Sequence, residues 1–420
     1  MGVLRNCIFV MVTALLITGN ATAYAEPSVD TLKAAFVRNG DLWLKVGSIE
    51  HQLTKGEFIR SPKWSYDGQW IAYTKGKEEQ ELWLWHVPSE QSQLVSPIRE
   101  ESYEWAPRKN KLAFLLDQKL IFVEPEKPTR RVDVASGIGN YSWLPDGSGF
   151  LASTQSILLP DGWTPIRILS IPLLKVGDPS QIRTLYVLPK PSEEFFAVTT
   201  SIFKWSATGH WIAFLANPTA SLSADSNILC VLSAEGTSFK QLDLMANNSQ
   251  WFNWSDMGDL LAYIGGVGRE ATSNKKLKLA DIPTGKLVTY TPAGYVDQSF
   301  TWHGPRRLVA SRAAESASRP FPSLVEVKLG RLQAKPLTDE SNTYGDFNPI
   351  SLPSRLLAWV RSDRIKADAI VAGSSGKNPV VFIPGIDLGA NFYEQWRWSD
   401  VLSFYTGERH SKKSSNMNMG

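Results

Sequence analysis

The sequence predicts an all-β protein, a β-propeller of seven or eight four-stranded blades. Three observations lead to this prediction: a tryptophan-led hairpin recurs along the chain, small and aromatic residues keep fixed offsets within it, and strand-like runs follow each copy. The 420 residues include 16 tryptophans, with 43% hydrophobic and 20% charged residues. This composition is typical of a folded chain long enough to form one large repeat array.

The repeated unit is a hairpin, seen most clearly in SPKWSYDGQWIAYT at residues 61–74. Its Tyr-Asp-Gly-Gln segment has turn chemistry, in which Asp caps the turn and Gly takes a positive φ. One hairpin cannot bury its own apolar face, whereas a series of hairpins can form a continuous core. Further copies begin at Trp105, Trp143, Trp205, Trp254 and Trp302, with a degenerate copy at Phe347 and a truncated one at Trp398.

Fixed positions within the unit indicate how its second strand is packed. The eighth residue after the leading ring is alanine in most copies, as at Ala72, and the next residue is often Tyr or Phe, as at Tyr73. Neighbouring strand residues point to opposite faces, so each unit places a small residue on one face and a ring on the other. Further β-rich runs follow, such as ELWLWHV from Glu81 and SQLVSP from Ser92. Four short strands per unit, repeated radially, are typical of a propeller.

The two ends of the chain are predicted to share one blade. Residues 34–46 and 51–54 resemble the later strands of a blade, but no leading strand precedes them. We expect the missing strand to come from NFYEQWRWS, residues 391–399, because pairing of the N- and C-terminal strands removes free sheet edges. Complete units lead with residues 64, 105, 143, 205, 254, 302 and 347, and a shared blade would make eight.

The chain divides into three predicted regions. Residues 1–25 form a secretory signal peptide with a basic start, an apolar run and Ala-Tyr-Ala before Glu26, the less favoured alternative being an uncleaved anchor. Residues 26–410 form the propeller, in which an insertion from Ser156 is predicted as a longer hairpin at one rim, and residues 411–420 form a polar disordered tail. Loss of the signal peptide leaves Cys230 as the single cysteine, so no disulfide is expected.

Charge and hydropathy exclude some classes of partner. The net charge of +3 becomes +2 when Arg5 is removed, since 43 basic residues then face 41 acidic ones. This near-balance gives no electrostatic reason for binding nucleic acid. No second long apolar segment is present, so the mature chain is predicted to stay out of the membrane as a monomer. It is expected to be secreted or associated with the cell envelope, and periplasmic if the source has an outer membrane.

The repeat resembles that of a known family. The unit W-S-x-D-G-x-x-I-A-F/Y at residues 64–73, and at 205–214 with Thr208 in the Asp place, is similar to the propeller repeat of TolB-like proteins and of dipeptidyl-peptidase-type proteases. The segment FYEQWRWSDVLSFY resembles the closing segment of uncharacterised, exported Gram-positive TolB-like proteins. The resemblance implies a non-catalytic propeller that binds protein partners in the cell envelope. We expect no α/β domain ahead of the propeller, so no role in a Tol-Pal assembly is implied.

No motif of a hydrolase active site is found in the sequence. The five histidines lie in different repeats or in the tail, there is no G-x-S-x-G elbow, and no peptidase-like α/β segment is expected after the array. A metal-dependent enzyme would need several His or carboxylate side chains converging on the central channel. We therefore predict no enzyme activity, no cofactor and no metal site.

The predicted binding surface is the set of residues just before each leading aromatic residue, where the innermost strands meet the channel and its rims. Their mixed charge and polarity would suit recognition of a peptide or glycan end. Two tryptophans outside the repeat register, Trp163 in the insertion and Trp251 in SQWFNWS, are candidate aromatic platforms. The predicted channel and rim residues are Arg60, Glu104, Tyr141, Lys204, Asn253, Asp297 and Asp346.

The predicted function is binding of a protein or peptide partner in the cell envelope or the extracellular space. The alternative is a propeller enzyme, a metal-dependent lyase or hydrolase acting on polysaccharide or peptide. A channel lined by unlike residues beside an exposed aromatic rim would favour the binding protein. A convergent cluster of His, Asp or Glu side chains would favour the enzyme.

Overall fold

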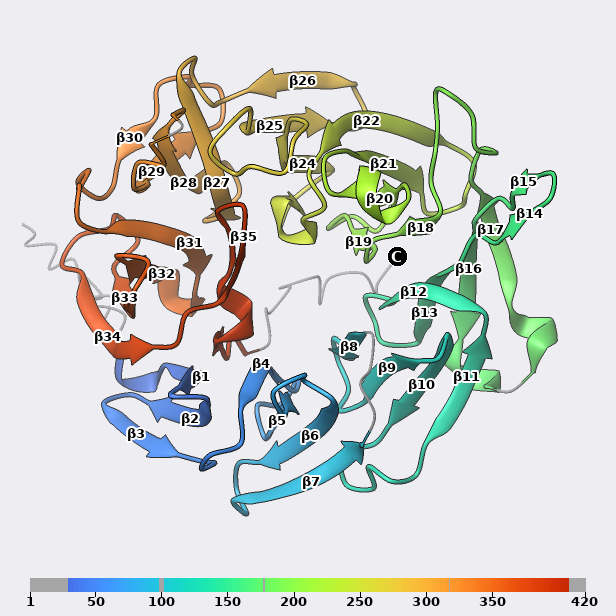
Figure 1. The fold of residues 1–420 in the computed structure, drawn as a ribbon, viewed down its shortest axis with the longest axis horizontal. Coiled ribbons are helices and arrows are strands. Elements are labelled where there is room, and N and C mark those ends of the chain that lie inside the picture. The colour runs from blue at the N-terminus through green and yellow to red at the C-terminus, as the bar shows by residue number, and fades with distance from the viewer. Residues whose placement is uncertain (1–28, 98–101, 177, 317, 408–420) are drawn as a thin grey trace, which may run out of the picture.

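The computed structural model describes residues 29–97, 102–176, 178–316 and 318–407. Eight four-stranded sheets are arranged as blades around a central axis (Figure 1). This arrangement confirms the predicted propeller and sets the number of blades at eight. The predicted signal peptide, residues 1–25, and the predicted polar tail, residues 411–420, lie outside the described residues.

Each blade begins with its innermost strand and continues outward through three more. Blade 1 consists of β37 (Leu402–Phe404), β1 (Lys33–Arg38), β2 (Asp41–Val46) and β3 (Ile49–Gln52). Blade 2 consists of β4 (Ile59–Trp64), β5 (Trp70–Lys75), β6 (Glu81–His86) and β7 (Gln91–Ser96). Blade 3 consists of β8 (Ser102–Trp105), β9 (Leu112–Leu116), β10 (Lys119–Val123) and β11 (Val132–Ser136). Blade 4 consists of β12 (Ile138–Trp143), β13 (Gly149–Thr154), β16 (Arg167–Pro172) and β17 (Arg183–Val187).

The second half of the ring follows the same order, although the innermost strand of blade 5 is split. Blade 5 consists of β18 (Thr199–Thr200) with β19 (Lys204–Trp205), β20 (Trp211–Asn217), β21 (Asn227–Ser233) and β22 (Phe239–Met245). Blade 6 consists of β23 (Phe252–Trp254), β24 (Leu260–Gly265), β25 (Lys276–Asp281) and β26 (Lys286–Thr289). Blade 7 consists of β27 (Tyr295–Trp302), β28 (Arg307–Ala314), β29 (Ser323–Lys328) and β30 (Lys335–Pro336). Blade 8 consists of β31 (Gly345–Ser351), β32 (Leu357–Ser362), β33 (Ala367–Ala372) and β34 (Val380–Ile386).

The remaining elements are short and lie in connections. Two hairpins stand outside the blades, β14 (Leu158–Leu159) with β15 (Gly162–Trp163), and β35 (Ala390–Phe392) with β36 (Gln395–Arg397). The helical segments are α1 (Ala220–Ser223), η1 (Val29–Thr31), η2 (Leu173–Lys175), η3 (Pro179–Gln181), η4 (Ser249–Trp251), η5 (Pro353–Arg355) and η6 (Trp398–Asp400).

The antiparallel order of the strands gives the propeller two different rims. Turns from the first to the second strand, and from the third to the fourth, lie at one rim, which we call the turn rim. Turns from the second to the third strand, and the connections between blades, lie at the other, which we call the loop rim. The loop rim carries residues 155–166, 218–226, 266–275 and 387–401, and therefore both extra hairpins.

The two strand faces pack against different neighbouring blades, as the alternation of small and aromatic residues predicts. Ala72 is fully buried in a cluster with Tyr103 and Phe114 of blade 3. Tyr73, the next residue, is fully buried in another cluster with Phe36 of blade 1. A small residue on one face and a ring on the other therefore let adjacent sheets pack closely.

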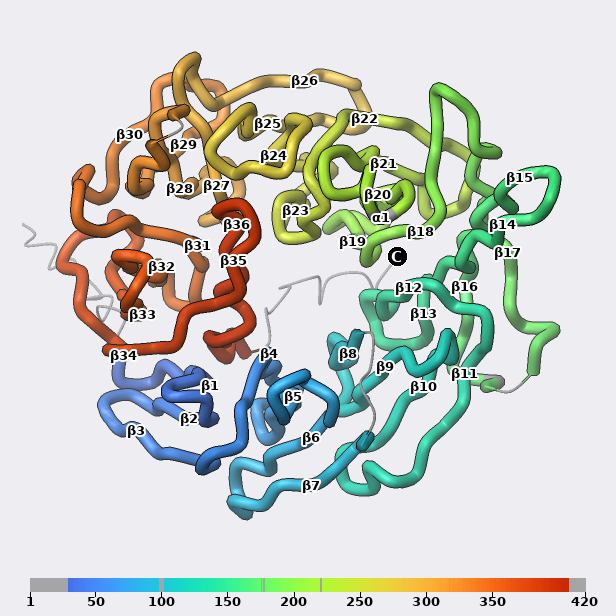
Figure 2. Tube along the Cα trace, in the orientation of Figure 1, coloured from blue at the N-terminus to red at the C-terminus, as the bar shows by residue number. Residues whose placement is uncertain are grey.

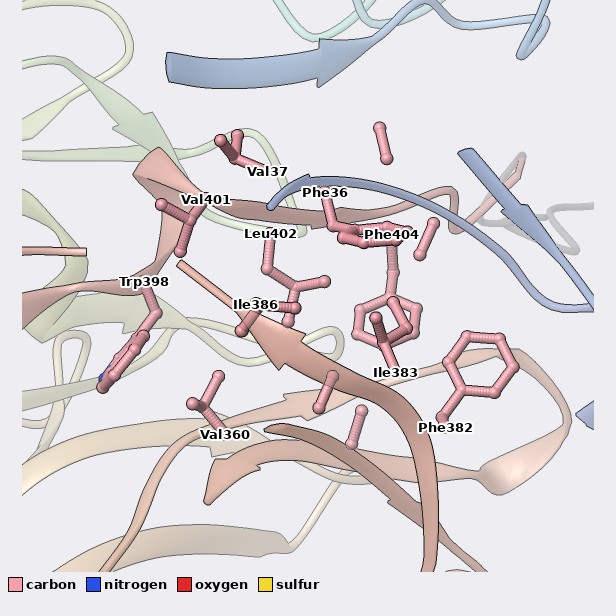
Figure 3. Close-up of a cluster of buried hydrophobic side chains, with 14 of the residues drawn as sticks. Phe36, Val37, Val360, Phe382, Ile383, Ile386, Trp398, Val401, Leu402 and Phe404 are labelled. Carbon is pink, nitrogen blue, oxygen red and sulfur yellow. The ribbon is translucent and has the colours of Figure 1, made fainter. Parts of the chain in front are cut away.

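The C-terminal strand closes the ring, but it is not the segment predicted from the sequence. The innermost strand of blade 1 is β37, whose Leu402 pairs with Phe36 of β1. Residues 391–399 instead form most of the β35–β36 hairpin and the start of η6. Figure 3 shows Leu402 and Phe404 among side chains of blades 1 and 8, including Phe36 and Ile383. Closure by both chain ends is thus confirmed with a corrected strand.

Two further details differ from the sequence prediction. The insertion from Ser156 contains only a short hairpin, β14–β15, because its later part forms β16, a regular strand of blade 4. In blade 8, the degenerate unit leads with Ser351 rather than Phe347. Ser351 pairs with Leu357 as Trp64 pairs with Ile71, and a bulge after Phe347 shifts the register.

Candidate functional site

The leading tryptophans join neighbouring blades by a repeated hydrogen bond. In five cases the indole nitrogen donates at 2.8–3.0 Å to a backbone carbonyl on the innermost strand of the preceding blade. The acceptor is always the residue before that blade's own leading position, so these rings act in packing. The donor and acceptor pairs are Trp64 with Ser403, Trp105 with Lys63, Trp143 with Glu104, Trp254 with Lys204, and Trp302 with Asn253.

Two lysines occupy this position before the leading ring and make the same contacts in blades 2 and 5. The Lys63 ammonium donates to the Tyr103 carbonyl at 2.8 Å and lies 4.5 Å from the centre of the Tyr103 ring. The Lys204 ammonium donates to the Phe252 carbonyl at 2.9 Å and lies 4.8 Å from the Phe252 ring centre. Each lysine side chain therefore extends to the neighbouring blade, where a carbonyl and an aromatic face stabilise its charge.

Glu104, at the same position in blade 3, interacts with both lysines. Burial raises the pKa of the Glu104 carboxyl, and the charges of Lys63 and Lys204 oppose that rise. Burial also lowers the pKa of Lys63, and it lowers the pKa of Lys204 to about 8. Since Glu104 and Lys204 belong to blades 3 and 5, their interaction crosses the axial side of blade 4. These three residues form what we call the axial cluster.

Three of the seven predicted channel and rim residues occupy this position on the innermost strands: Glu104, Lys204 and Asn253. Asn253 is exposed on β23. Sequence reasoning missed Lys63 of β4. Its side chain is exposed, although its ammonium contacts the Tyr103 carbonyl and ring. The signal was present, because applying the single offset before each leading ring throughout the chain selects Lys63 together with these three.

Three other predicted residues are buried, so their predicted place at the channel is corrected. Tyr141 is 1% exposed, and its hydroxyl donates to the Ala113 carbonyl at 2.7 Å. It lies two residues before Trp143 and therefore on the opposite strand face from the axial position. Asp297 and Asp346 are buried, and each forms a cross-strand ion pair, with Arg312 at 2.8 Å and with Arg361 at 2.8 and 3.0 Å. Both carboxylates hold their own blades together.

Arg60 lies at the loop-rim end of β4 rather than deep at the axis. Its guanidinium is 3.5 Å from the carboxylate of Asp387, in the connection that follows β34. The side chain is about one-third exposed. Arg60 is therefore a rim residue that joins blade 2 to the segment closing the ring.

The two predicted aromatic platforms differ in their surroundings. Trp163 is half-buried on β15, where it pairs with Leu158 at the loop rim. Trp251, at the end of η4, is only 2% exposed and so does not present a free face. It instead lines a pocket at the loop rim together with Trp396 and Trp398 of the C-terminal segment.

The β35–β36 hairpin lies across the inner ends of blades 6 to 8 at the loop rim (Figure 2). Glu394 at its turn is 6% exposed; its carboxylate accepts from Arg364 at 3.0 Å and lies 3.7 Å from Arg319. The hairpin also pairs with the 266–275 loop, where the Ala271 amide donates to the Tyr393 carbonyl at 2.9 Å. Ion pairs and a backbone hydrogen bond thus fasten the hairpin to blades 6, 7 and 8.

The tip of this hairpin presents aromatic side chains beside arginines. Phe392 is 57% exposed and Tyr393 47% exposed. The Arg397 guanidinium lies 5.4 Å from the Phe392 ring centre, and the Arg269 guanidinium 5.3 Å from that of Tyr393. Exposed aromatic rings and arginines are the residue types that most often dominate protein interfaces.

Two kinds of feature are absent from the described residues. His, Cys, Asp and Glu side chains within residues 29–407, apart from the three short gaps in description, form no group of three or more placed to hold a metal ion. In that same part of the chain, no helix has the length and apolar character needed to cross a membrane.

Comparison with known proteins relates the chain to other propellers by structure. No protein-family model matches the chain, and no curated protein matches its sequence. The dihydro-heme d1 dehydrogenase NirN in complex with DHE has a TM-score of 0.60, with 10% identity, over 88% of this chain and 76% of NirN. Dipeptidyl peptidase 4 of Porphyromonas gingivalis has a TM-score of 0.55, with 10% identity, over 84% of this chain and 58% of the peptidase.

A puromycin-hydrolyzing peptidase of Mycobacterium tuberculosis has a TM-score of 0.50 and 13% identity, over 86% of this chain. The likeness is one of fold. The chain spans 56% of that peptidase and 58% of the Porphyromonas enzyme, so it matches little more than half the length of either.

Proposed function

We propose that this chain is an exported, non-catalytic propeller of the TolB-like kind that binds a peptide or protein segment across its loop rim. The observation that supports this most is the β35–β36 hairpin, whose exposed Phe392 and Tyr393 stand beside arginines at the inner end of the ring. Such a surface offers apolar contact area together with charge-assisted hydrogen bonds.

Neighbouring loop-rim segments extend this surface. The Arg269 side chain pairs with Asp225 at 2.7 Å, which joins the 266–275 loop to the 218–226 loop. Leu222 and Val267 on these loops are 56% and 44% exposed. Three connected segments therefore present apolar side chains on the loop rim, while the axial cluster supplies both signs of charge deeper in the ring, near the turn-rim ends of the innermost strands. A partner segment that contacts the rim and enters the axis would use both.

Site-specific photocrosslinking tests this proposal. A photoreactive phenylalanine analogue replaces Phe392 in the full chain, and the protein is irradiated on cells that produce it. The matched control carries the analogue at Leu332, which is 71% exposed between β29 and β30 on the turn rim. A discrete adduct formed from position 392 and absent from position 332 supports the proposal. No adduct, or the same adducts from both positions, contradicts it.

The competing class is an enzyme acting on polysaccharide or peptide, and one observation favours it. The Glu104 carboxyl has a raised pKa and faces two lysines, an arrangement that suits proton transfer. Turnover of a polysaccharide or peptide by the purified protein, abolished in Glu104→Gln with the fold intact, would replace the binding proposal.

A further inference from the structure

The pocket at the loop rim contains an unpartnered buried amide. It lies between the β35–β36 hairpin and the inner ends of blades 6, 7 and 8. Gln298 of β27 lines this pocket and is 6% exposed. Neither its amide nitrogen nor its amide oxygen has a hydrogen-bond partner among the described residues. A buried polar group without a partner is destabilising, so this side chain is placed to bind something.

Three of the other amides around the pocket are already engaged. Gln250 donates to the Ser399 hydroxyl at 2.8 Å, and Gln395 donates to the Arg269 carbonyl at 2.7 Å. Asn248 donates to the Gln395 amide oxygen at 3.3 Å. These bonds build the walls of the pocket. Gln298 therefore differs from these three in that both its donor and its acceptor are buried without a partner among the described residues.

A third unpartnered polar atom belongs to the same pocket. The indole nitrogen of Trp398, a residue 1% exposed, has no hydrogen-bond partner among the described residues. Trp398 also lines the pocket and stacks on Trp396, with ring centres 5.1 Å apart. The pocket thus offers two N–H donors and one carbonyl acceptor between aromatic walls.

The charge and size of the pocket restrict its ligand. Glu394, the single ionisable residue of the lining, is compensated by Arg364 and Arg319, so the pocket should prefer a neutral group. The enclosed part of the pocket has room for about one or two water molecules, although its open mouth is wider. That space is too small for a sugar ring. It is close to the size of a carboxamide, which both donates and accepts as Gln298 requires.

We propose that this pocket recognises the carboxamide side chain of an Asn or Gln residue in the segment that the rim binds. The carboxamide pairs with Gln298 through one N–H···O bond in each direction. This inference rests on the proposed function, because the carboxamide is carried by the peptide partner. Loss of either bond leaves buried groups unpaired again, so a ligand without the carboxamide should bind at least about tenfold more weakly.

Peptide selection tests the inference. A random heptapeptide phage library is selected on the full chain, with counter-selection on Gln298→Met, which keeps the side-chain length and removes both polar atoms. We expect the selected peptides to share Asn or Gln at one position. A synthetic copy with Glu or Met at that position should bind the unmodified chain at least about tenfold more weakly. On the Gln298→Met chain, all three peptides should bind alike.

Several results would overturn the inference. The first is a set of selected peptides that shows no preference for Asn or Gln, and the second is equal binding of a selected peptide to the unmodified and Gln298→Met chains. The inference also fails if a neutral saccharide binds at Gln298 instead of a peptide, or if a structure with the selected peptide shows only water on Gln298. Thermal unfolding checks that Gln298→Met folds, and Gln298→Asn, which shortens the side chain but keeps its chemistry, provides a second variant expected to weaken binding. Crosslinking at Phe392 reports the proposed function separately, so an adduct there with no carboxamide preference overturns this inference alone.

Discussion

Lys63 and Lys204 show how one position on the innermost strand determines the chemistry of the axis. Each lies just before a leading tryptophan and donates to a carbonyl of the next blade. The backbone carbonyl of each lysine accepts a hydrogen bond from the indole N–H of the leading tryptophan in that next blade. Main chain and side chain are thus both fixed, and the ammonium groups are held near Glu104. The resulting loss of solvation is what lowers the pKa of both lysines.

This loss of solvation predicts a pH dependence of stability. With a pKa of about 8 in the folded chain and about 10.4 when unfolded, Lys204 binds fewer protons in the folded state between these values. Stability due to this group therefore rises with pH across that window. Lys204→Met removes this pH-dependent contribution. The free energy of unfolding of the variant minus that of the unmodified chain should therefore be largest near pH 7 and fall towards pH 10. Urea unfolding of both proteins at several pH values measures this, and a difference independent of pH would contradict it.

The axial residues could be predicted from the sequence only in part, and the reason lies in strand geometry. Glu104, Lys204 and Asn253 share one offset, and that offset suffices wherever the leading ring is recognisable. Asp297 lies five residues before Trp302, with a bulge between Asp297 and Ser299. A bulge changes the face on which earlier residues lie, so counting backwards fails beyond it. Gln298, beside the same bulge, carries no sequence signal of its own.

Between elements, the indole hydrogen bond is the most regular contact of the ring. It joins five of the eight blade interfaces described above. The interface of blades 4 and 5 differs, because the Trp205 indole nitrogen is buried without a partner among the described residues. There the innermost strand of blade 5 is split, and the Phe203 amide donates instead to the Ser142 hydroxyl at 2.8 Å.

This difference between blades gives a matched pair of substitutions. Trp254→Phe removes ring volume and a 2.8 Å hydrogen bond to the Lys204 carbonyl, whereas Trp205→Phe removes similar volume and an unpaired donor. We expect the free energy of unfolding to fall by about 1–3 kcal/mol more for Trp254→Phe than for Trp205→Phe. Denaturant unfolding provides the measurement. Equal losses would show that the rings act by volume alone.

The sequence predicts strands well where the aromatic and hydrophobic pattern of the repeat is kept. It predicts them less well where the leading ring is absent or where aromatic residues serve another element. The leading position of blade 8 is Ser351, which has no ring, so its neighbour Phe347 drew the prediction four residues too early. The closing strand was placed at 391–399 because that segment is rich in aromatic residues. Those rings serve the hairpin instead, and the short apolar run Leu402–Phe404 closes the sheet. Composition alone could not separate the two roles.

At the scale of the whole molecule, stability depends on closure, because every blade except the shared one is continuous in sequence. Blade 1 obtains its innermost strand from the other chain end, and blades 1 and 8 share a large apolar cluster across this junction (Figure 3). The Trp64 indole also bonds to Ser403, so blade 2 depends on the closing strand as well. A short segment therefore completes contacts with both of its neighbours.

Two truncations test how much the ring depends on this segment. A chain ending after Gly407 keeps β37 and should unfold cooperatively, as the full chain does. A chain ending after Asp400 loses the buried side chains of Val401, Leu402 and Phe404, each contributing about 1.5–3 kcal/mol of apolar burial. Their sum approaches the 5–15 kcal/mol that typically stabilises a folded domain. We therefore expect the shorter chain to lose its cooperative thermal transition and to expose apolar surface to a fluorescent dye. A normal transition in that chain would show that seven complete blades hold the ring without closure.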